Sequence, residues 1–184
     1  IRTPLTSIVG YVEALRNDSE LTEMEKERYL SILVNKAENL KNVIDEIFQM
    51  ARLDADEFEL DCDVCDLAEI VRESLIDFRP EIKKAELATE IKIPEKDCLI
   101  YADRLSVKRI INNILKNSLK YGKDGGVIGI ELSVNEQGYN LYIWDQGDGI
   151  KKEDIPYVFE RLYMGDRSRN DSSSGSGLGL AIAK

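Results

Sequence analysis

Residues 113–121 read Asn113-Ile-Leu-Lys-Asn117-Ser-Leu-Lys120-Tyr121 and combine amide, basic and apolar side chains at helical spacing. Asn113 and Asn117 are four residues apart, so both amides project from one face of a helix, and Lys120 extends that face. Amide oxygens suit a hard cation such as Mg²⁺, and a lysine suits phosphate. A pair of asparagines alone is more often an exposed polar face, so this segment needs support from its surroundings.

A second cluster, Asp145-Gln-Gly147-Asp-Gly149, follows directly after a predicted strand. A carboxylate at the end of a strand can accept a hydrogen bond from an exocyclic amine, and the two glycines allow a ligand to approach the backbone closely. The motif by itself is weak, because an ordinary turn has the same composition.

A third cluster, Gly175-Ser-Gly177-Leu178-Gly179, leads into a predicted apolar helix. Free backbone N–H groups and the helix dipole favour an anion at such a place. The cluster matches neither the dinucleotide fingerprint nor the P-loop. In this order the three clusters predict sites for a metal ion, adenine and phosphate, and residues 164–174 have the composition of a mobile flap.

The elements around these clusters predict one layered α+β domain. Asp66 and Glu69 predict the start of a helix that ends before Pro80, and Asp103 predicts the start of a helix through Tyr121. Strands are expected at residues 60–65, 87–93, 98–102, 127–134 and 139–144. The strand at 87–93 alternates as if half-buried, with Leu87, Thr89, Ile91 and Ile93 facing inward.

The first third of the chain predicts two helices joined by a short loop. A helix with Pro4 inside it is already running at residue 1, and Thr22 with Glu25 forms a capping box for a second helix that ends near Leu53. The apolar residues recur at heptad spacing. They are Ile1, Leu5, Ile8, Val12 and Leu15, then Leu30, Leu33, Ala37, Leu40, Ile44, Ile47 and Ala51. We favour a dimer of hairpins forming a four-helix bundle over packing of this face on the rest of the chain.

Composition excludes several classes of function. The 184 residues carry 35 acidic and 25 basic side chains, a net charge of −10, which argues against general binding of nucleic acid. The sequence contains no His, which excludes a Ser-His-Asp triad and a His-based metal site. Cys62-Asp-Val-Cys65 lacks further zinc ligands, so we expect Cys62, Cys65 and Cys98 to be half-buried strand thiols.

At this point the sequence resembles bacterial sensor histidine kinases of two-component systems. Residues 113–121 look like the N box, 145–149 like the G1 box, 159–163 like the F box and 175–180 like the G2 box, while residues 1–5 look like the end of the H box. Within that family the chain resembles membrane-bound kinases of the vancomycin-resistance sensor type. The resemblance implies a dimerisation and phosphotransfer hairpin at 1–54, a linker at 55–61 and a Bergerat-type ATP-binding α/β sandwich at 62–184.

The resemblance also implies roles for single residues. Asn117 would hold Mg²⁺, Asp145 would bind the adenine amine, and Thr3 would orient a water for phosphatase activity. Residues that would support the nucleotide and its phosphates or line its pocket are Asn113, Lys120, Tyr121, Gly147, Gly149, Gly175, Gly177, Leu178 and Gly179. Leu162 and Met164 depart from the family pattern, and Arg167 or Arg169 would supply the positive charge that Met164 lacks.

The implied function is an ATP-dependent protein-histidine kinase, with ATP and Mg²⁺ as cofactors and a response-regulator receiver domain as partner. We expect the phospho-accepting His two residues before Ile1, the closing strands of the sheet after Lys184, and a membrane-anchored sensor of which this chain is a cytoplasmic part. One alternative is a degenerate kinase that acts as a dimeric docking scaffold. Another is a Bergerat ATPase of the chaperone or mismatch-repair type, which would not have the heptad hairpin.

Overall fold

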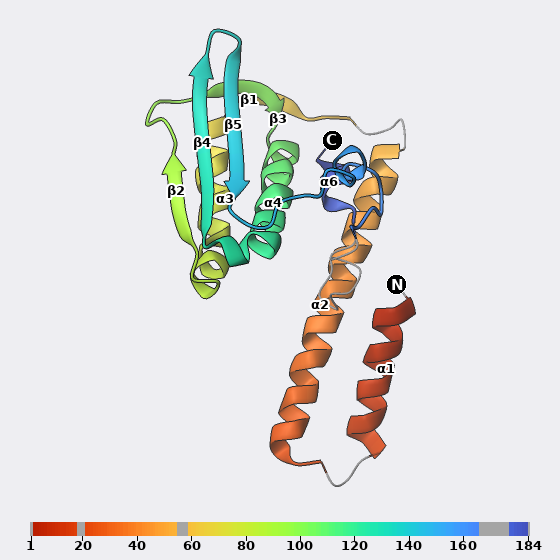
Figure 1. Cartoon of the computed structure of the whole chain (residues 1–184). Coiled ribbons are helices and arrows are strands. Elements are labelled where there is room, and N and C mark those ends of the chain that lie inside the picture. Colours follow the sequence, from red (N-terminus) through yellow and green to blue (C-terminus); the bar gives the residue numbers. More distant parts are fainter. Residues whose placement is uncertain (1, 18–20, 55–58, 166–176, 184) are drawn as a thin grey trace. The chain divides into compact units, whose positions relative to one another are not determined.

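The structure is a computed structural model that describes residues 2–17, 21–54, 59–165 and 177–183. The chain divides into two compact units, Ile1–Glu57 and Phe58–Lys184 (Figure 1), which we call the helical hairpin and the α/β unit. None of the described helices combines the length and the apolar character needed to cross a membrane.

The helical hairpin consists of α1 (Arg2–Asn17) and α2 (Glu23–Asp54), two antiparallel helices that contact each other along α1. The predicted capping box is confirmed. Thr22 N donates to Glu25 Oε2 at 2.9 Å, and Glu25 N donates to Thr22 Oγ1 at 3.3 Å. The hydrogen bond from the Thr22 side chain lowers the pKa of Glu25. Tyr11 and Tyr29 pack edge to face across the hairpin with ring centroids 5.2 Å apart.

The α/β unit follows the predicted order of elements. It contains β1 (Cys62–Asp66), α3 (Leu67–Lys84), β2 (Ala88–Lys92), β3 (Leu99–Asp103), α4 (Arg104–Tyr121), β4 (Val127–Asn135), β5 (Gly138–Asp145) and α6 (Gly179–Ile182). Short 3-10 turns lie at Lys123–Gly125 and Ile155–Tyr157. One sheet has the order β2-β4-β5, with β2 parallel and β5 antiparallel to β4, and β1 pairs with β3 in an antiparallel ribbon.

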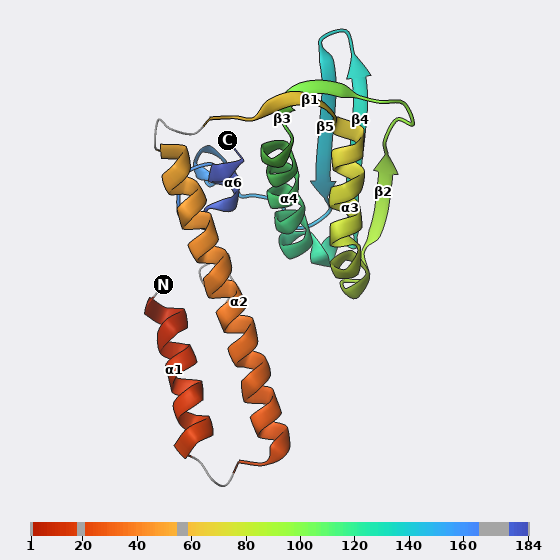
Figure 2. The ribbon, with the colours of Figure 1, turned by 180° about the vertical axis from the view of Figure 1, so that it is seen from behind.

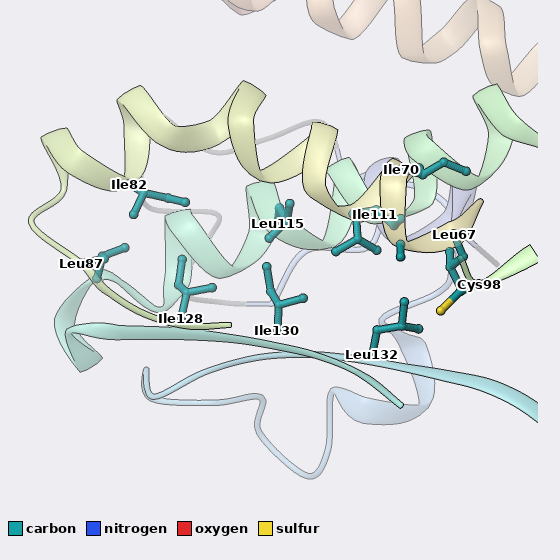
Figure 3. Close-up of a cluster of buried hydrophobic side chains, with 12 residues drawn as sticks. Leu67, Ile70, Ile82, Leu87, Cys98, Ile111, Leu115, Ile128, Ile130 and Leu132 are labelled. Atoms are coloured by element: carbon teal, nitrogen blue, oxygen red, sulfur yellow. The ribbon is translucent and has the colours of Figure 1, made fainter. Parts of the chain in front are cut away.

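Helices α3 and α4 cover one face of the β2-β4-β5 sheet, as the two opposite views show (Figures 1 and 2). The core lies between these layers (Figure 3). Alternate residues of β4 point into it, and α3 and α4 each contribute one apolar stripe. Its best-buried members are Ile70 and Val71 on α3, Ile111 and Leu115 on α4, and Ile128 and Ile130 on β4. Each such side chain contributes about 1.5–3 kcal/mol by leaving water.

Two aspartates at strand ends cap α3 and α4, the two long helices of the α/β unit. Asp66 Oδ1 accepts from Ala68 N at 2.9 Å and from Cys98 N at 2.8 Å. Asp103 Oδ1 accepts from Ser106 N at 2.8 Å, and its Oδ2 accepts from Asp61 N at 3.0 Å. Both predicted helix starts are therefore confirmed, and each cap also holds a neighbouring backbone segment.

The predicted end of α3 before Pro80 is wrong, because the helix continues through Pro80 to Lys84. The extra turn places Ile82 in the core beside Leu87. Burial of these apolar side chains offsets the hydrogen bond that proline cannot donate. Glu69 also differs from expectation. It pairs with Arg104 at 3.0 Å rather than completing a cap.

The strand at Ala88–Lys92 is not half-buried as predicted. Thr89 and Ile91 are exposed, and only the flanking Leu87 and Ile93 reach the core. Among the described strands β2 pairs with β4 alone, so it forms an edge of the sheet (Figure 1). The alternating sequence therefore reflects an edge strand rather than a covered one.

The cysteines are free thiols. Cys62 and Cys65 are half-buried on β1, as predicted, and their spacing of three places them on opposite faces of the strand. Cys98 differs from the prediction because it is fully buried, and this burial raises its pKa. The part of the chain that the structure describes holds no group of three metal-binding side chains of the Cys and carboxylate types.

Candidate functional site

Helix α4 carries an unusual number of unsatisfied polar atoms. Among the described residues, four buried side-chain nitrogen or oxygen atoms have no hydrogen-bond partner, and three of them belong to α4. These are Asn112 Oδ1, Asn113 Nδ2 and Lys120 Nζ, with Ser74 Oγ as the fourth. A buried polar group left unpaired costs about 1–3 kcal/mol, and more when it is charged. Such atoms on one helix make it a candidate ligand-binding surface, because a bound ligand could supply the partners that the described residues do not.

Lys120 is the strongest of these features. Its ammonium group is buried and lies 4.9 Å from the centroid of the Tyr121 ring, with no hydrogen-bond partner within the described residues. The ring satisfies only part of the charge, because a lysine has three N–H donors. An anion such as phosphate would satisfy the rest.

Asp145 lies at the end of β5, where its Oδ1 accepts a hydrogen bond from Gly147 N at 3.0 Å. This bond closes the predicted turn after the strand and fixes the direction of the carboxylate. Gly149, two residues further on, is exposed and has a φ of 70°, a left-handed conformation that favours glycine.

Three glycines let the end of α4 pack directly against the turn at 145–147. A Cβ on Gly122 would lie 2.3 Å from Asp145 Cβ, and one on Gly147 would lie 2.3 Å from Tyr121 O. A Cβ on Gly125 would lie 2.1 Å from Gln146 O. The first two predicted clusters therefore meet, with the backbone at Tyr121 and Gly122 beside Asp145 and Gly147.

The third cluster meets the first through Asn113. A Cβ on Gly179 would lie 3.8 Å from Asn113 Cγ, and the preceding Leu178 is 2% exposed. Gly177 has a φ of 73° and packs against Leu162 and Tyr163. The predicted helix near Leu178 is present, but α6 is only four residues long.

The F-box segment is fixed by two hydrogen bonds. Leu162, whose φ of 63° is unusual for a branched side chain, donates its N–H to Gly177 O at 3.0 Å. Tyr163 donates its hydroxyl to Asp154 Oδ1 at 2.6 Å. The first bond joins the F-box segment to Gly177 of the third cluster, and the second closes the segment from Asp154 to Tyr163.

Several predicted residues lie outside the described part of the chain. They are Arg167, Arg169 and Gly175, together with most of the predicted flap at 164–174. Thr3 lies in α1, but its side chain is not described. Asn117 is described and lies half-buried on α4, one turn after Asn113.

Sequence reasoning missed Asn112 and Gly122. The double asparagine at 112–113 was a visible signal, but helical spacing places Asn112 off the face that Asn113 and Asn117 share. Gly122 follows the helix and reads as an ordinary C-terminal glycine. Its contact with Asp145 joins segments that are far apart in sequence, so no local pattern reveals it.

Two family models match the chain. Residues 1–56 match the His Kinase A (phospho-acceptor) domain, and residues 102–184 match the histidine kinase-, DNA gyrase B-, and HSP90-like ATPase. The first match excludes the reading as a chaperone or mismatch-repair ATPase. Sensor histidine kinase YcbM of Bacillus subtilis (strain 168) is 34% identical over all of this chain and 59% of its own length. Sensor protein VanS of Enterococcus faecium is 32% identical over all of this chain and 47% of its own length.

The solved structures that resemble the chain are also histidine kinases. The mycobacterial sensor histidine kinase MprB is 30% identical with a TM-score of 0.55, over 66% of this chain and 75% of its own. Histidine kinase ThkA, solved in complex with response regulator protein TrrA, is 23% identical with a TM-score of 0.74, over 89% and 47%. Full-length ShkA, solved in complex with AMPPNP, is 24% identical with a TM-score of 0.67, over 98% and 37%. The chain spans less than two thirds of the two curated relatives. The hairpin, the ATPase-type α/β unit and these matches together show that the chain belongs to the sensor histidine kinase family.

Proposed function

We propose that this chain is the core of an ATP-dependent protein-histidine kinase of a two-component system. The buried ammonium of Lys120, which has no hydrogen-bond partner among the described residues, is the observation that carries the proposal, because an anionic ligand at the end of α4 would satisfy it. The unpaired Asn113 amide and the glycine turns beside it support the same site. ShkA, a structural relative, was solved with an ATP analogue.

The residues present fit ATP with Mg²⁺. Lys120 would hold the phosphates, and the amide oxygen of Asn117 would bind Mg²⁺, which prefers oxygen ligands. The carboxylate of Asp145 would accept a hydrogen bond from the adenine amine. Tyr121 and the backbone at Gly147, Gly149, Gly177, Leu178 and Gly179 would line the nucleotide, with Arg167, Arg169 and Gly175 as further proposed contacts.

The chemistry that ATP supplies when bound is a transferable phosphoryl group, with Mg²⁺ neutralising part of its charge. The contribution of the chain is positioning and electrostatic stabilisation, which dominate phosphoryl transfer. The ammonium of Lys120 is itself buried, and charge interactions of a buried group are stronger than in bulk water. Asp145 is held by Gly147 N, so it can fix the base without reorganising.

The test is calorimetric titration of the chain with ATP and Mg²⁺. Asp145→Ala should weaken binding about ten- to hundredfold, the effect of losing a hydrogen bond to a charged group. Asp124→Ala removes an exposed carboxylate from the neighbouring turn and serves as the matched control. Unchanged affinity in Asp145→Ala would show that another residue binds the adenine. Absence of any ATP binding by the unsubstituted chain would favour the docking-scaffold alternative.

We also propose that two hairpins associate into a four-helix bundle. The hairpin leaves a face of large apolar side chains exposed in the single chain, including Leu5, Val12, Leu30, Ile44 and Ile47. Ile44→Asp would place a carboxylate in the dimer interface and should dissociate the dimer. Ser31→Asp adds the same charge at an exposed position of α2 and should not. Sedimentation at micromolar concentration distinguishes the two outcomes, and a monomeric unsubstituted chain would contradict the dimer.

The proposed partner is the receiver domain of a response regulator, which would receive the phosphoryl group on an Asp. ThkA, a structural relative, was solved with a response regulator. We further propose that Thr3 orients a water for dephosphorylation of the regulator, since its hydroxyl can both donate and accept. In a chain extended upstream to include the phospho-accepting His, Thr3→Ala should keep autophosphorylation and slow dephosphorylation. Equal loss of both activities would assign Thr3 to shaping the helix before Pro4.

The relatives are sensor proteins, so we propose that this chain is a cytoplasmic part of a membrane-anchored sensor. Fractionation of cells that express the whole protein, with antibody against this region, would test the assignment. Recovery of the intact protein in the soluble fraction would contradict it.

A further inference from the structure

The carboxylate of Asp103 joins two backbone segments with different roles. Its Oδ1 accepts from Ser106 N at 2.8 Å, in the first turn of α4. Its Oδ2 accepts from Asp61 N at 3.0 Å. Asp61 belongs to residues 59–61, the connector through which the chain passes from the hairpin into β1. One side chain therefore holds both the connector and the start of the helix that bears Asn113, Asn117 and Lys120.

The equivalent aspartate before α3 does not do this. Asp66 uses one oxygen, Oδ1, for both of its backbone contacts, and its donors Ala68 N and Cys98 N lie outside the connector at residues 59–61. Helix capping alone is thus achieved without a bond to the connector. The second oxygen of Asp103 adds a contact that capping does not require.

We propose that Asp103 couples the connector to the nucleotide helix, so that order in one favours order in the other. The inference rests on the proposed function, because it takes ATP as the ligand that restrains α4. Helix α4 is continuous from Arg104 to Tyr121, so a ligand held near Lys120 also restrains the turn at Ser106. Coupling of this kind is reciprocal: if the ligand orders the connector, the ordered connector strengthens ligand binding by the same factor.

Amide hydrogen exchange of Asp61, followed by NMR in the full chain, tests the proposal directly. In the unsubstituted protein the Asp61 amide should exchange slowly, and MgATP should slow it further. Asp103→Ser keeps an oxygen for the helix cap, because serine is a good N-cap residue, but it has no second oxygen in the place of Oδ2, which accepts from Asp61 N. In this variant Asp61 should exchange about ten- to hundredfold faster and should no longer respond to MgATP.

Asp66→Ser is the matched control. It should speed exchange at Cys98 and leave the response of Asp61 to MgATP intact. A second route avoids the helix cap altogether, since Asp61→Pro removes the donor and leaves Asp103 in place. Asp61→Pro should weaken MgATP binding measurably, whereas Glu59→Pro, two residues earlier in the same connector, should not.

The outcomes separate the two claims. If MgATP binds but leaves Asp61 exchange unchanged, the coupling is overturned and the proposed function stands. The coupling is also overturned, and the proposed function again stands, if Asp61→Pro and Glu59→Pro bind MgATP with equal affinity. If the unsubstituted chain does not bind MgATP, the proposed function fails, and the coupling fails with it.

Discussion

Helices α3 and α4 follow the same plan but end in different chemistry. Each has 18 residues and follows a five-residue strand whose last residue is the aspartate that caps it. Each also contributes fully buried aliphatic side chains to the core. Yet α4 carries three buried polar atoms without partners, whereas α3 carries one, Ser74 Oγ. The shared plan is a scaffold, and the candidate site is where that scaffold leaves polar groups unsatisfied.

The largest effect on stability should come from the hydrophobic core, to which both helices contribute. Ile70 on α3 and Leu115 on α4 are both 0% exposed. Replacing either by Ala should destabilise the α/β unit by about 2–5 kcal/mol, through lost burial and the cavity left behind. Urea unfolding followed by fluorescence of Trp144, the single tryptophan of the sequence, reports on this unit. If only one of the two variants loses stability, the two helices do not support the core equally.

The second-largest effect should come from a lysine substitution that affects α4 but not α3. Lys120 occupies the same place on α4 as Lys83 on α3, counted from the capping aspartates, but Lys83 is exposed. Lys120→Met should weaken ATP binding about ten- to hundredfold, because an ionic hydrogen bond to phosphate is lost. The same change should stabilise the nucleotide-free chain, since it removes a buried, unpaired charge. Calorimetry and urea unfolding should show neither effect for Lys83→Met. Equal behaviour of the two variants would contradict the special role of Lys120.

Acid unfolding tests how much the capping aspartate of α4, Asp103, contributes to stability. Hydrogen bonds from the backbone, first that of Ser106 and then that of Asp61, lower the pKa of Asp103 below its usual 3.8. A carboxylate with a lowered pKa in the folded state stabilises the fold above the unfolded pKa. That stability is lost as pH falls from about 3.8 through the folded value. Thermal unfolding between pH 6 and pH 2, as rough limits around the carboxyl pKa, should show a smaller acid-induced drop in melting temperature for Asp103→Asn. An unchanged drop would show that the bonds to Asp103 do not contribute.

The smallest effect should come from the ion pairs between the helices. Arg104 contacts Glu69 and Glu73 at 3.0 and 2.7 Å, and Lys108 contacts Glu73 and Asp77 at 3.4 and 2.9 Å. These side chains are partly exposed, so Lys108→Met should cost only about 0–1 kcal/mol. The difference from the unsubstituted protein should shrink in high salt. A cost that persists at high salt would point to packing by the lysine stem instead.

Local signals in the sequence predicted much of this architecture. The aspartates at 66 and 103 marked both helix starts, and the apolar runs at 127–134 and 139–144 marked two neighbouring strands of the sheet. The helix through Pro80 was missed because the gain from burying Ile82 is a tertiary effect, invisible to a rule about proline. The exposure of Ile91 was missed because alternation does not tell an edge strand from a covered one.

The candidate site shows the same limit. Residue type and spacing indicated Asn113, Asn117, Lys120 and Asp145 as site residues. Three of them gain support from features that only the fold creates: Asn113 lies beside Gly179, Asp145 packs against Gly122, and the Lys120 ammonium is buried with no partner among the described residues. Asn112 was passed over although it stands next to Asn113, because helical spacing places it off the shared face and its unpaired Oδ1 is visible only in the fold.

The parallel pairing of β2 with β4 sets an order of events when the chain folds. β4 and β5 are neighbours in sequence and can close as a hairpin within microseconds. β2 can join β4 only after the chain between them, including β3 and α4, has been folded back across the sheet. Long-range pairing of this kind requires loop closure before it gains any contacts, and it slows folding. The last strand to dock is therefore expected to be β2. Until it docks, the edge of β4, next to the core and one strand from Asp145, stays open to pairing with another chain.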